Sequence, residues 1–465
     1  MRDWLELRSL VRVDSAVCNH QARLVLLKLF SCDICTQERI VNVNTESCAQ
    51  WFSKRKVHLT RVSLSVASQE ISKCLRLHSK SIWYARCTDQ ATIDLVALNC
   101  RNLKSFLCDK LTVTPNLNAV LGFGTNLQEL RLEEVQDLQV SHFEEVFLPN
   151  LRFLSLFGTD CDDTLLSAIL RATEGLQHLN IGDCGNITDV GLVAMAKHCL
   201  HLRSIGLNKL QISDGALAEF TELCSCIENV KIYENELITD AGVLSITRNL
   251  TKLRNIKLSL CDALTDRSLE HLAKFNVTTL ETLCACGIEQ VRVDVLVRLL
   301  QQCQQLRTLV LDCDINPYYA EVVPHMSNLQ SLSLYSTLSD DCLCMIARHC
   351  QQLQKFGIPC AFKVDNDLVT AAHQSALEAG VSDVRVMHCA DVEASENDVI
   401  YTEKAVLAMM DKLPKLKLIW APEVSGDELN DRVVQRLWQR SRPGLRFERD
   451  EKKFFLEVLG DITVL

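Results

Sequence analysis

A short leucine-rich phrase returns at nearly regular intervals along most of this chain. Its form is LxxLxL or a close variant, and from residue 176 onward successive copies start 23 to 27 residues apart. A period of this length is typical of a solenoid, in which repeats stack because none can bury its apolar face alone. The copies begin at Leu59, Leu103, Leu127, Leu151, Leu176, Leu202, Ile227, Leu253, Leu280, Leu306 and Leu329.

One copy shows what each repeat is expected to form. Leu176, Leu179 and Ile181 alternate with polar residues, as in a short strand with one buried face. Thr188 then suits the N-cap of a helix, and Asp189 suits its first turn, where negative charge is favoured. Apolar residues at helical spacing follow. Each repeat is therefore predicted to be a strand, a turn and a helix.

Stacking of such repeats predicts an α/β leucine-rich-repeat solenoid with a parallel concave sheet and convex helices. A helix is wider than the strand spacing of about 4.8 Å, so the stack is expected to curve into a horseshoe. We expect the repeats to occupy residues 59–420. A helical N-terminal cap at residues 1–58 and a C-terminal cap at residues 421–465 would cover the ends of the solenoid core.

The repeat pattern is weak in two places. A degenerate copy is expected to start at Ser79, with Ile82 and Tyr84 pointing inward. Beyond residue 353 the pattern loosens, and strands are expected at residues 381–386 and 413–418. The acidic stretch at residues 391–398 lies between them and is either a binding loop on the rim or a solvated loop.

Composition and charge exclude several classes of protein. The net charge is −10, and no block of Lys and Arg is present, so we expect no nucleic-acid partner. No run reaches the roughly 18 apolar residues that span a bilayer, so no membrane segment is predicted. The first residues lack the basic start and apolar core of a secretory signal. A cytoplasmic or nuclear protein is therefore expected.

The 23 cysteines follow the repeat rather than a disulfide framework. Buried thiols that pack as small hydrophobic groups and donate weakly to turn carbonyls explain their positions, so a reducing compartment is expected. Cys32 and Cys35 have the CxxC spacing of half a zinc or redox site, but no second pair lies at finger spacing. No metal site is therefore predicted. The recurring positions are Cys100, Cys199, Cys303 and Cys350 at helix ends, and Cys87, Cys184 and Cys261 after strands.

The open face of the sheet is predicted to bind a protein. Residues two, four and six places after each leading residue point to the concave face, while those three and five places after it enter the core. Aromatic residues displayed outward on a strand indicate an interface, unless flanking loops or the N-terminal cap cover the rings. The predicted partner-binding residues are Trp83, Arg131, Phe153, Phe157, His178, Lys231, Tyr233 and Tyr335.

No catalytic motif is present in the sequence. We find no GxSxG elbow, no HExxH helix and no phosphate-binding loop with its lysine. The histidines at positions 198, 201 and 349 fall near helix ends, where packing roles suffice. The chain is therefore predicted not to be an enzyme, with no catalytic residue and no cofactor.

The repeats are similar to the cysteine-containing class of leucine-rich repeats. Cys184-Gly-Asn-Ile-Thr-Asp and Cys199-Leu-His-Leu carry the likeness, which covers about residues 59–420. Residues 7–18 resemble the second half of an F-box, although the Leu-Pro pair that opens an F-box is missing and Gln21 stands where a tryptophan is expected. An amphipathic cap over the first repeat is the alternative. The F-box-like positions are Leu7, Leu10, Val13, Val17 and Cys18.

These resemblances imply a function in protein recognition. F-box proteins with leucine-rich repeats bind a Skp-type adaptor and a cullin through the F-box, and hold a protein substrate for ubiquitin transfer. The resemblance therefore implies a substrate-recognition subunit of an SCF-type ubiquitin ligase. A protein-interaction scaffold without a ligase is the alternative. A GTPase-activating protein fits less well, because repeats of that class run to about 28 or 29 residues.

Overall fold

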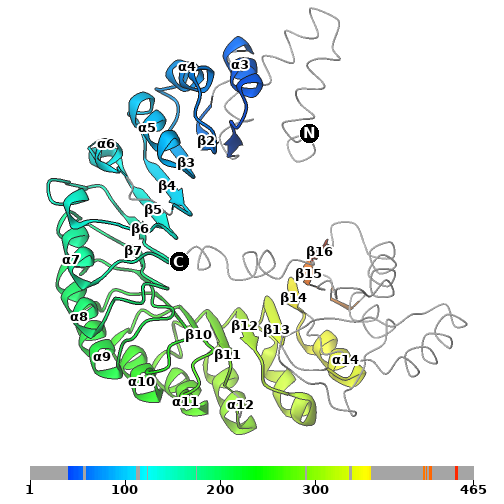
Figure 1. Cartoon of the computed structure of the whole chain (residues 1–465). Coiled ribbons are helices and arrows are strands. Elements are labelled where there is room, and N and C mark those ends of the chain that lie inside the picture. Colours follow the sequence, from blue (N-terminus) through cyan, green and yellow to red (C-terminus); the bar gives the residue numbers. More distant parts are fainter. Residues whose placement is uncertain are drawn as a thin grey trace, which may run out of the picture. The chain divides into compact units, whose positions relative to one another are not determined.

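The computed structural model describes most of the repeat region of the chain. The described residues are 40–55, 59–111, 116–122, 124–173, 175–288, 291–334, 338–357, 412–413, 415, 418–420 and 446–448. The chain divides into two compact units, residues 1–202 and residues 203–465. Both units are built from parallel strands that alternate with helices along the sequence (Figure 1).

The first unit contains strands β1 to β7, and every strand pairs in parallel with the next one along the chain. The strands are β1 (Val41–Asn42), β2 (Arg61–Leu64), β3 (Tyr84–Cys87), β4 (Ser105–Asp109), β5 (Glu129–Glu133), β6 (Phe153–Ser155) and β7 (His178–Asn180). The helices are α3 (Glu46–Arg55), α4 (Gln69–Leu77), α5 (Gln90–Asn99), α6 (Asn118–Leu121), α7 (Asp163–Arg171) and α8 (Asp189–His198), with 3-10 turns η2 (Gly124–Asn126) and η3 (Val140–His142).

The second unit continues the same alternation, with strands β8 to β16 paired in parallel and in sequence order. The strands are β8 (Ser204–Gly206), β9 (Asn229–Tyr233), β10 (Asn255–Ser259), β11 (Thr282–Cys286), β12 (Thr308–Leu311), β13 (Ser331–Leu334), β14 (Lys355–Gly357), β15 (Leu418–Trp420) and β16 (Arg446–Glu448). The helices are α9 (Asp214–Leu223), α10 (Asp240–Asn249), α11 (Asp266–Phe275), α12 (Val293–Gln302), α13 (Tyr319–Val322) and α14 (Asp340–His349), with 3-10 turns η4 (Asn316–Tyr318) and η5 (Val323–Met326).

The apolar positions of the repeat form the core of each unit. In the repeat that starts at Leu253, the side chains of Leu253, Ile256 and Leu258 are all fully buried. Helices line one face of each sheet, and the other face carries the outward residues of the strands (Figure 1). The predicted leucine-rich-repeat solenoid with a parallel sheet is therefore confirmed in each unit. No helix within the described ranges combines the length and the apolar character that crossing a bilayer requires.

The structure corrects the register of the degenerate repeat. Strand β3 pairs Tyr84 with Ser105 and Cys87 with Cys108. Ser105 lies two places after Leu103, so the leading residue of this repeat is Ile82 and the predicted start at Ser79 is wrong by three residues. Tyr84 therefore occupies an outward position rather than the inward one that the sequence predicted. The sequence misplaces the start of this repeat because the segment is apolar at several neighbouring positions. In addition, Cys87 fills a core position that leucine takes in other repeats.

The parallel sheet also begins earlier than predicted. Strand β1 pairs with β2, so a strand and the helix α3 of the same alternating pattern precede residue 59. At the other end, β14 pairs directly with β15, and Phe356 lies opposite Ile419. This pairing moves the start of the repeat three residues along the chain from residue 413, where the sequence predicted it. The strand predicted at residues 381–386 and the acidic stretch at 391–398 lie outside the described residues.

Several cysteines act as the predicted packing and turn groups. The C-caps of α5, α8, α12 and α14 are Cys100, Cys199, Cys303 and Cys350. The Cys184 thiol donates to the Leu156 carbonyl oxygen at 3.0 Å, across to the preceding repeat. Burial raises the pKa of Cys184 to about 11, although a hydrogen bond from Thr159 opposes the shift. Every cysteine within the described residues is a free thiol. Cys87 differs from the prediction because it lies inside a strand.

An aspartate at the start of a helix binds the cap threonine of the following repeat. Asp214, the first residue of α9, accepts hydrogen bonds from the Thr239 N–H at 2.9 Å and from its hydroxyl at 2.6 Å. Thr239 also caps α10. The same two bonds join Asp240 to Thr265 and Asp163 to Thr188. The Thr-Asp pair that the sequence assigns to helix capping therefore also ties neighbouring repeats together.

The Asp240 carboxylate predicts a dependence of stability on pH. Burial raises the pKa of Asp240, but hydrogen bonds from Ser268 and Thr265 outweigh this effect and hold the pKa below its ordinary value. A carboxyl whose pKa is depressed on folding stabilises the protein above its unfolded pKa, and this stabilisation is lost as the pH falls through the folded pKa. We expect Asp240→Asn to lower the free energy of unfolding by about 1 kcal/mol at pH 7. The loss should shrink as the pH falls below about 4.

Urea unfolding at neutral and acidic pH measures this difference. Asp262→Asn is the control, because it removes the same charge from an exposed turn of the next repeat. A loss of equal size at both pH values for Asp240→Asn would contradict the assignment of the effect to the carboxylate.

Candidate functional site

The first unit gathers three of the predicted partner-binding residues into one contact group. The Arg131 guanidinium lies 4.3 Å from the centre of the Phe153 ring. Phe153 stacks on the imidazole of His178, with ring centres 6.0 Å apart and planes inclined by 25°. Strand register explains the contact, since Glu129 of β5 pairs with Phe153 and Phe153 pairs with His178. We call Arg131, Phe153 and His178 the Arg131 cluster.

Carboxylates hold the arginine of this cluster in place. The Arg131 Nε atom lies 2.6 Å from a Glu129 oxygen, and one of its terminal nitrogens lies 3.8 Å from a Glu133 oxygen. These three residues occupy the second, fourth and sixth places of one repeat, so they share one face of β5. The Arg131 side chain is 18% exposed and therefore keeps some access to solvent. The arrangement presents a fixed cation with an aromatic ring beneath it.

A second aromatic group lies on β2 and β3 of the same unit. The Arg61 guanidinium lies 5.4 Å from the Trp83 ring centre and 4.7 Å from that of Tyr84. Trp83 precedes β3, so it occupies the edge of the strand rather than an outward position within it. Burial raises the pKa of Tyr84. The next outward residue, Arg86, forms an ion pair with Asp109 of β4.

Sequence reasoning missed Arg61, Tyr84 and Arg86. The correct repeat start at Ile82 would have selected Tyr84 and Arg86 by the same two-and-four rule that selected Arg131. Arg61 lies two places after Leu59, so the same rule places it on the outward face. Phe157 is half-buried in the turn after β6, where its backbone carbonyl accepts from the Glu134 N–H at 2.7 Å.

Two further predicted residues belong to β9 of the second unit. Lys231 and Tyr233 are both half-buried and occupy the fourth and sixth places of their repeat. Strand register sets Lys231 opposite Lys257 of β10, a residue that the sequence analysis did not single out. Burial lowers the pKa of Lys231. Tyr335 and the F-box-like residues from Leu7 to Cys18 lie outside the described residues.

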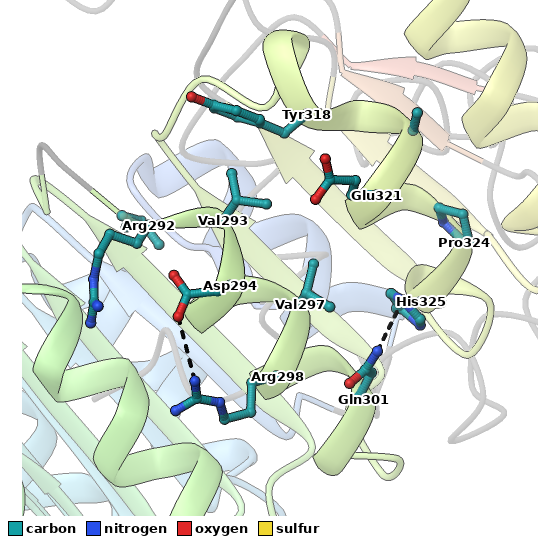
Figure 2. Close-up of a pocket in the computed structure, with 12 residues that line it drawn as sticks. Arg292, Val293, Asp294, Val297, Arg298, Gln301, Tyr318, Glu321, Pro324 and His325 are labelled. Atoms are coloured by element: carbon teal, nitrogen blue, oxygen red, sulfur yellow. Dashed lines mark hydrogen bonds and ion pairs between the residues drawn. The ribbon is translucent and has the colours of Figure 1, made fainter.

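A groove of about 1020 Å³ lies on the helical side of the second unit, between α12 and the segment from η4 to η5 (Figure 2). The repeat that starts at Leu306 is the shortest of its series, and it carries only the four-residue helix α13 where its neighbours carry helices of ten residues. Pro317 and Pro324 are the second residues of its 3-10 turns. Pro324 has no N–H to donate, so α13 cannot continue past it as a regular helix.

Several of the polar groups that line the groove have partners within the protein. Figure 2 shows the Arg298 guanidinium directed at Asp294, with 3.4 Å between nitrogen and oxygen, and the Gln301 amide 3.2 Å from the His325 ring. Arg292 pairs with Asp266 outside the groove. Because both arginines of the groove are paired within the protein, the groove is a weaker candidate than the sheet face.

Comparison with curated proteins agrees with the repeat geometry. No protein-family profile matches the chain. F-box/LRR-repeat protein 4 of Bos taurus is 30% identical over 154 residues, which is 32% of this chain and 25% of that protein. Antagonist of mitotic exit network protein 1 of Candida glabrata is 27% identical over 184 residues, 38% of this chain and 34% of that protein. The chain is therefore similar, over about a third of its length, to proteins with leucine-rich repeats.

The leucine-rich-repeat chain also resembles F-box proteins of this repeat class, as the sequence predicted. The match spans between a quarter and about a third of the length of the two curated relatives. Among solved structures, a chain of the yeast Rad7 and Elc1 complex aligns with a TM-score of 0.43 and 18% identity, over 74% of this chain and 89% of that one. An internalin from Listeria monocytogenes aligns with a TM-score of 0.42 and 22% identity, over 68% and 83%.

Proposed function

We propose that this leucine-rich-repeat protein recognises a protein partner through the outward face of its sheets and carries out no chemistry of its own. The Arg131 cluster is the observation that carries the proposal, because it places a guanidinium over one aromatic ring and stacks that ring on another. Arginine and large aromatic side chains are enriched at the energetic centres of protein interfaces. Ion pairs with Glu129 and Glu133 fix the arginine before a partner arrives, which lowers the entropy cost of binding.

We infer further that this recognition serves an SCF-type ubiquitin ligase. Similarity to F-box/LRR-repeat protein 4 supports this inference, as does the resemblance of residues 7–18 to the second half of an F-box. In this proposal the F-box-like residues bind a Skp-type adaptor that connects to a cullin. The sheet face then presents a protein substrate for ubiquitin transfer, in the cytoplasm or the nucleus.

A binding assay with a purified Skp-type adaptor tests the ligase proposal. We expect the full chain to bind the adaptor, and the double variant Leu10→Asp, Val13→Asp to bind at least about 30-fold more weakly, because it places charges at positions meant for an apolar contact. The matched control is Arg131→Ala, Phe153→Ala, which alters the sheet face and should leave adaptor affinity unchanged. Absence of adaptor binding by the unmodified chain would refute the ligase role.

A protein-interaction scaffold without a ligase is the second candidate. The departures of residues 7–18 from the F-box pattern, including Gln21 in place of a tryptophan, favour it. The two candidates share the sheet face and differ only in the adaptor. The same assay therefore separates them, since a scaffold keeps its partner and ignores the adaptor. A GTPase-activating role is less suited to these repeat lengths, and a single-turnover GTPase assay would reveal it.

A further inference from the structure

Two thiols lie in contact on the outward side of β11. Cys284 lies four places after Leu280, at an outward place of its repeat, and Cys286 lies two places beyond it on the same face. Their sulfur atoms are 3.9 Å apart. Cys284 is 7% exposed and Cys286 is half-buried, so the pair meets solvent at the sheet face. We call Cys284 and Cys286 the thiol pair.

The groups around Cys284 favour its thiolate. Hydrogen bonding from Cys286 has the largest effect on the pKa of Cys284 and lowers it. The Ser259 hydroxyl, 3.6 Å from the Cys284 sulfur, and the charge of Lys257 on the neighbouring strand lower it further. Together they outweigh burial and the charge of Asp312, which raise the pKa. The pKa of Cys286 is raised, first by its hydrogen bond to Cys284 and then by burial, so this thiol keeps its proton.

The backbone of β11 brings the two sulfurs close enough to bond. Residues two places apart on a strand have Cα atoms about 6.6 Å apart. A disulfide usually joins Cα atoms that are about 4.4 to 6.8 Å apart, so the strand needs to shorten only slightly. Gly287 follows the thiol pair with a φ of 86°, which glycine adopts without strain, so the chain can bend there. A disulfide near the upper limit of separation is strained and is therefore readily reduced.

We propose that the thiol pair is a site of reversible oxidation, at which a peroxide converts the two thiols into a disulfide. The Cys284 thiolate first attacks one oxygen of hydrogen peroxide, so that a sulfur–oxygen bond forms, the O–O bond breaks and hydroxide leaves. Cys286 then loses its proton and attacks the sulfenic sulfur, so that the S–S bond forms and a second hydroxide leaves. The protons released by the two thiols convert both hydroxides to water. The thiol pair gives up two electrons and the peroxide accepts them.

The thiol pair differs from the cysteines that pack in the core. Cys184 is fully buried and donates to a carbonyl oxygen, and burial raises its pKa to about 11. The thiol pair instead lies on the face that the proposed function assigns to a protein partner, so a disulfide there also alters that face. Oxidation needs only a peroxide and no protein partner, so it is independent of the proposed function.

Peptide mapping of the peroxide-treated full chain tests the proposal. Trypsin cleaves after Lys274 and after Arg292, and the peptide 275–292 between them contains the thiol pair and no other cysteine. After hydrogen peroxide, unfolding in urea and iodoacetamide, we expect this peptide to carry a disulfide in place of two alkylated thiols. Dithiothreitol should restore both thiols. The disulfide should form at least about tenfold faster than Cys344, a half-buried free thiol of α14, is oxidised, because a thiolate is the reactive form.

Two substitutions separate the roles of the thiols. Cys286→Ser removes the thiol that closes the disulfide, so Cys284 should accumulate a sulfenic acid that dimedone captures. Cys284→Ser removes the attacking sulfur, so Cys286 should stay reduced at the same peroxide concentration. The matched control is Cys344→Ser, which should leave formation of the disulfide unchanged. Thermal unfolding midpoints close to that of the unmodified chain show that the variants fold.

The unmodified chain alone can overturn the proposal, whether or not the variants fold. It fails if both cysteines of the peptide 275–292 can still be alkylated once Cys344 is oxidised. It also fails if the disulfide forms as fast in the chain unfolded by urea, because the fold then contributes nothing. Oxidation of Cys286 in Cys284→Ser at the rate of the unmodified chain would overturn it as well. Adaptor binding is measured separately, so failure here leaves the ligase proposal standing.

Discussion

Replacing Asn235 by alanine is expected to lower the free energy of unfolding by about 2 to 6 kcal/mol. The Asn235 side chain is buried and serves two backbone groups of the preceding repeat. Its amide donates to the Leu207 carbonyl oxygen, and its own oxygen accepts from the Leu210 N–H at 2.7 Å. Alanine leaves both buried groups without this partner, and each such loss costs about 1 to 3 kcal/mol.

Asn235→Cys is the informative companion to this variant. Asn235 occupies the place that Cys184 occupies in an earlier repeat, eight residues after the leading residue, and Cys184 donates to the equivalent carbonyl of Leu156. A thiol at position 235 restores the donor but not the acceptor, so we expect it to recover about half of the lost stability.

Denaturant unfolding combined with hydrogen exchange of the Leu210 amide measures both variants. Exchange at this amide should speed up in Asn235→Ala and stay fast in Asn235→Cys, because neither variant provides its acceptor. Unchanged unfolding midpoints in both variants would show that water replaces the amide without cost.

Gly242→Ala is expected to destabilise the protein by about 2 to 3 kcal/mol, although alanine is the better helix former by about 1 kcal/mol. A Cβ at Gly242 would lie 2.4 Å from a carboxylate oxygen of Asp214. That carboxylate cannot simply move, since it holds the N–H and hydroxyl of Thr239. The steric cost therefore exceeds the gain in helix propensity.

Gly215→Ala is the matched control, because Gly215 lies in the first turn of α9 and a Cβ there would meet only the Ser213 hydroxyl at 3.6 Å. This variant should be neutral or up to about 1 kcal/mol more stable. The double variant Asp214→Ala, Gly242→Ala removes the clash, so its loss should be smaller than the sum of the two single losses. Equal effects of Gly242→Ala and Gly215→Ala in urea unfolding would contradict the tie between repeats.

Periodicity predicts the core of this protein well and its register less well. Leu253, Ile256 and Leu258 were placed correctly because only one alignment of the phrase fits their segment. Around Ile82 several alignments place apolar residues inward, and hydrogen bonding between β3 and β4 decides among them. The local sequence pattern does not determine the register of β3, because register depends on pairing with the neighbouring strand.

The contacts of the site were less predictable than its residues. Arg131, Phe153 and His178 were selected as outward residues, but the stacking among them depends on strand pairing and side-chain rotamers. Lys257 was missed, although it occupies the same place as Lys231 in the next repeat. Its burial depends on its neighbours in space, and its own sequence carries no sign of it.

The role of Cys184 as a carbonyl donor has a consequence for the chemical durability of the protein. Raising a thiol pKa from its usual value to about 11 reduces the fraction of reactive thiolate at neutral pH about a hundredfold. Cys100, Cys303 and Cys350 have pKa values raised by burial to about 12, so they lose a further tenfold. These four buried thiols should resist alkylation by iodoacetamide until their repeats unfold, so the rate at which they are captured reports the opening of those repeats.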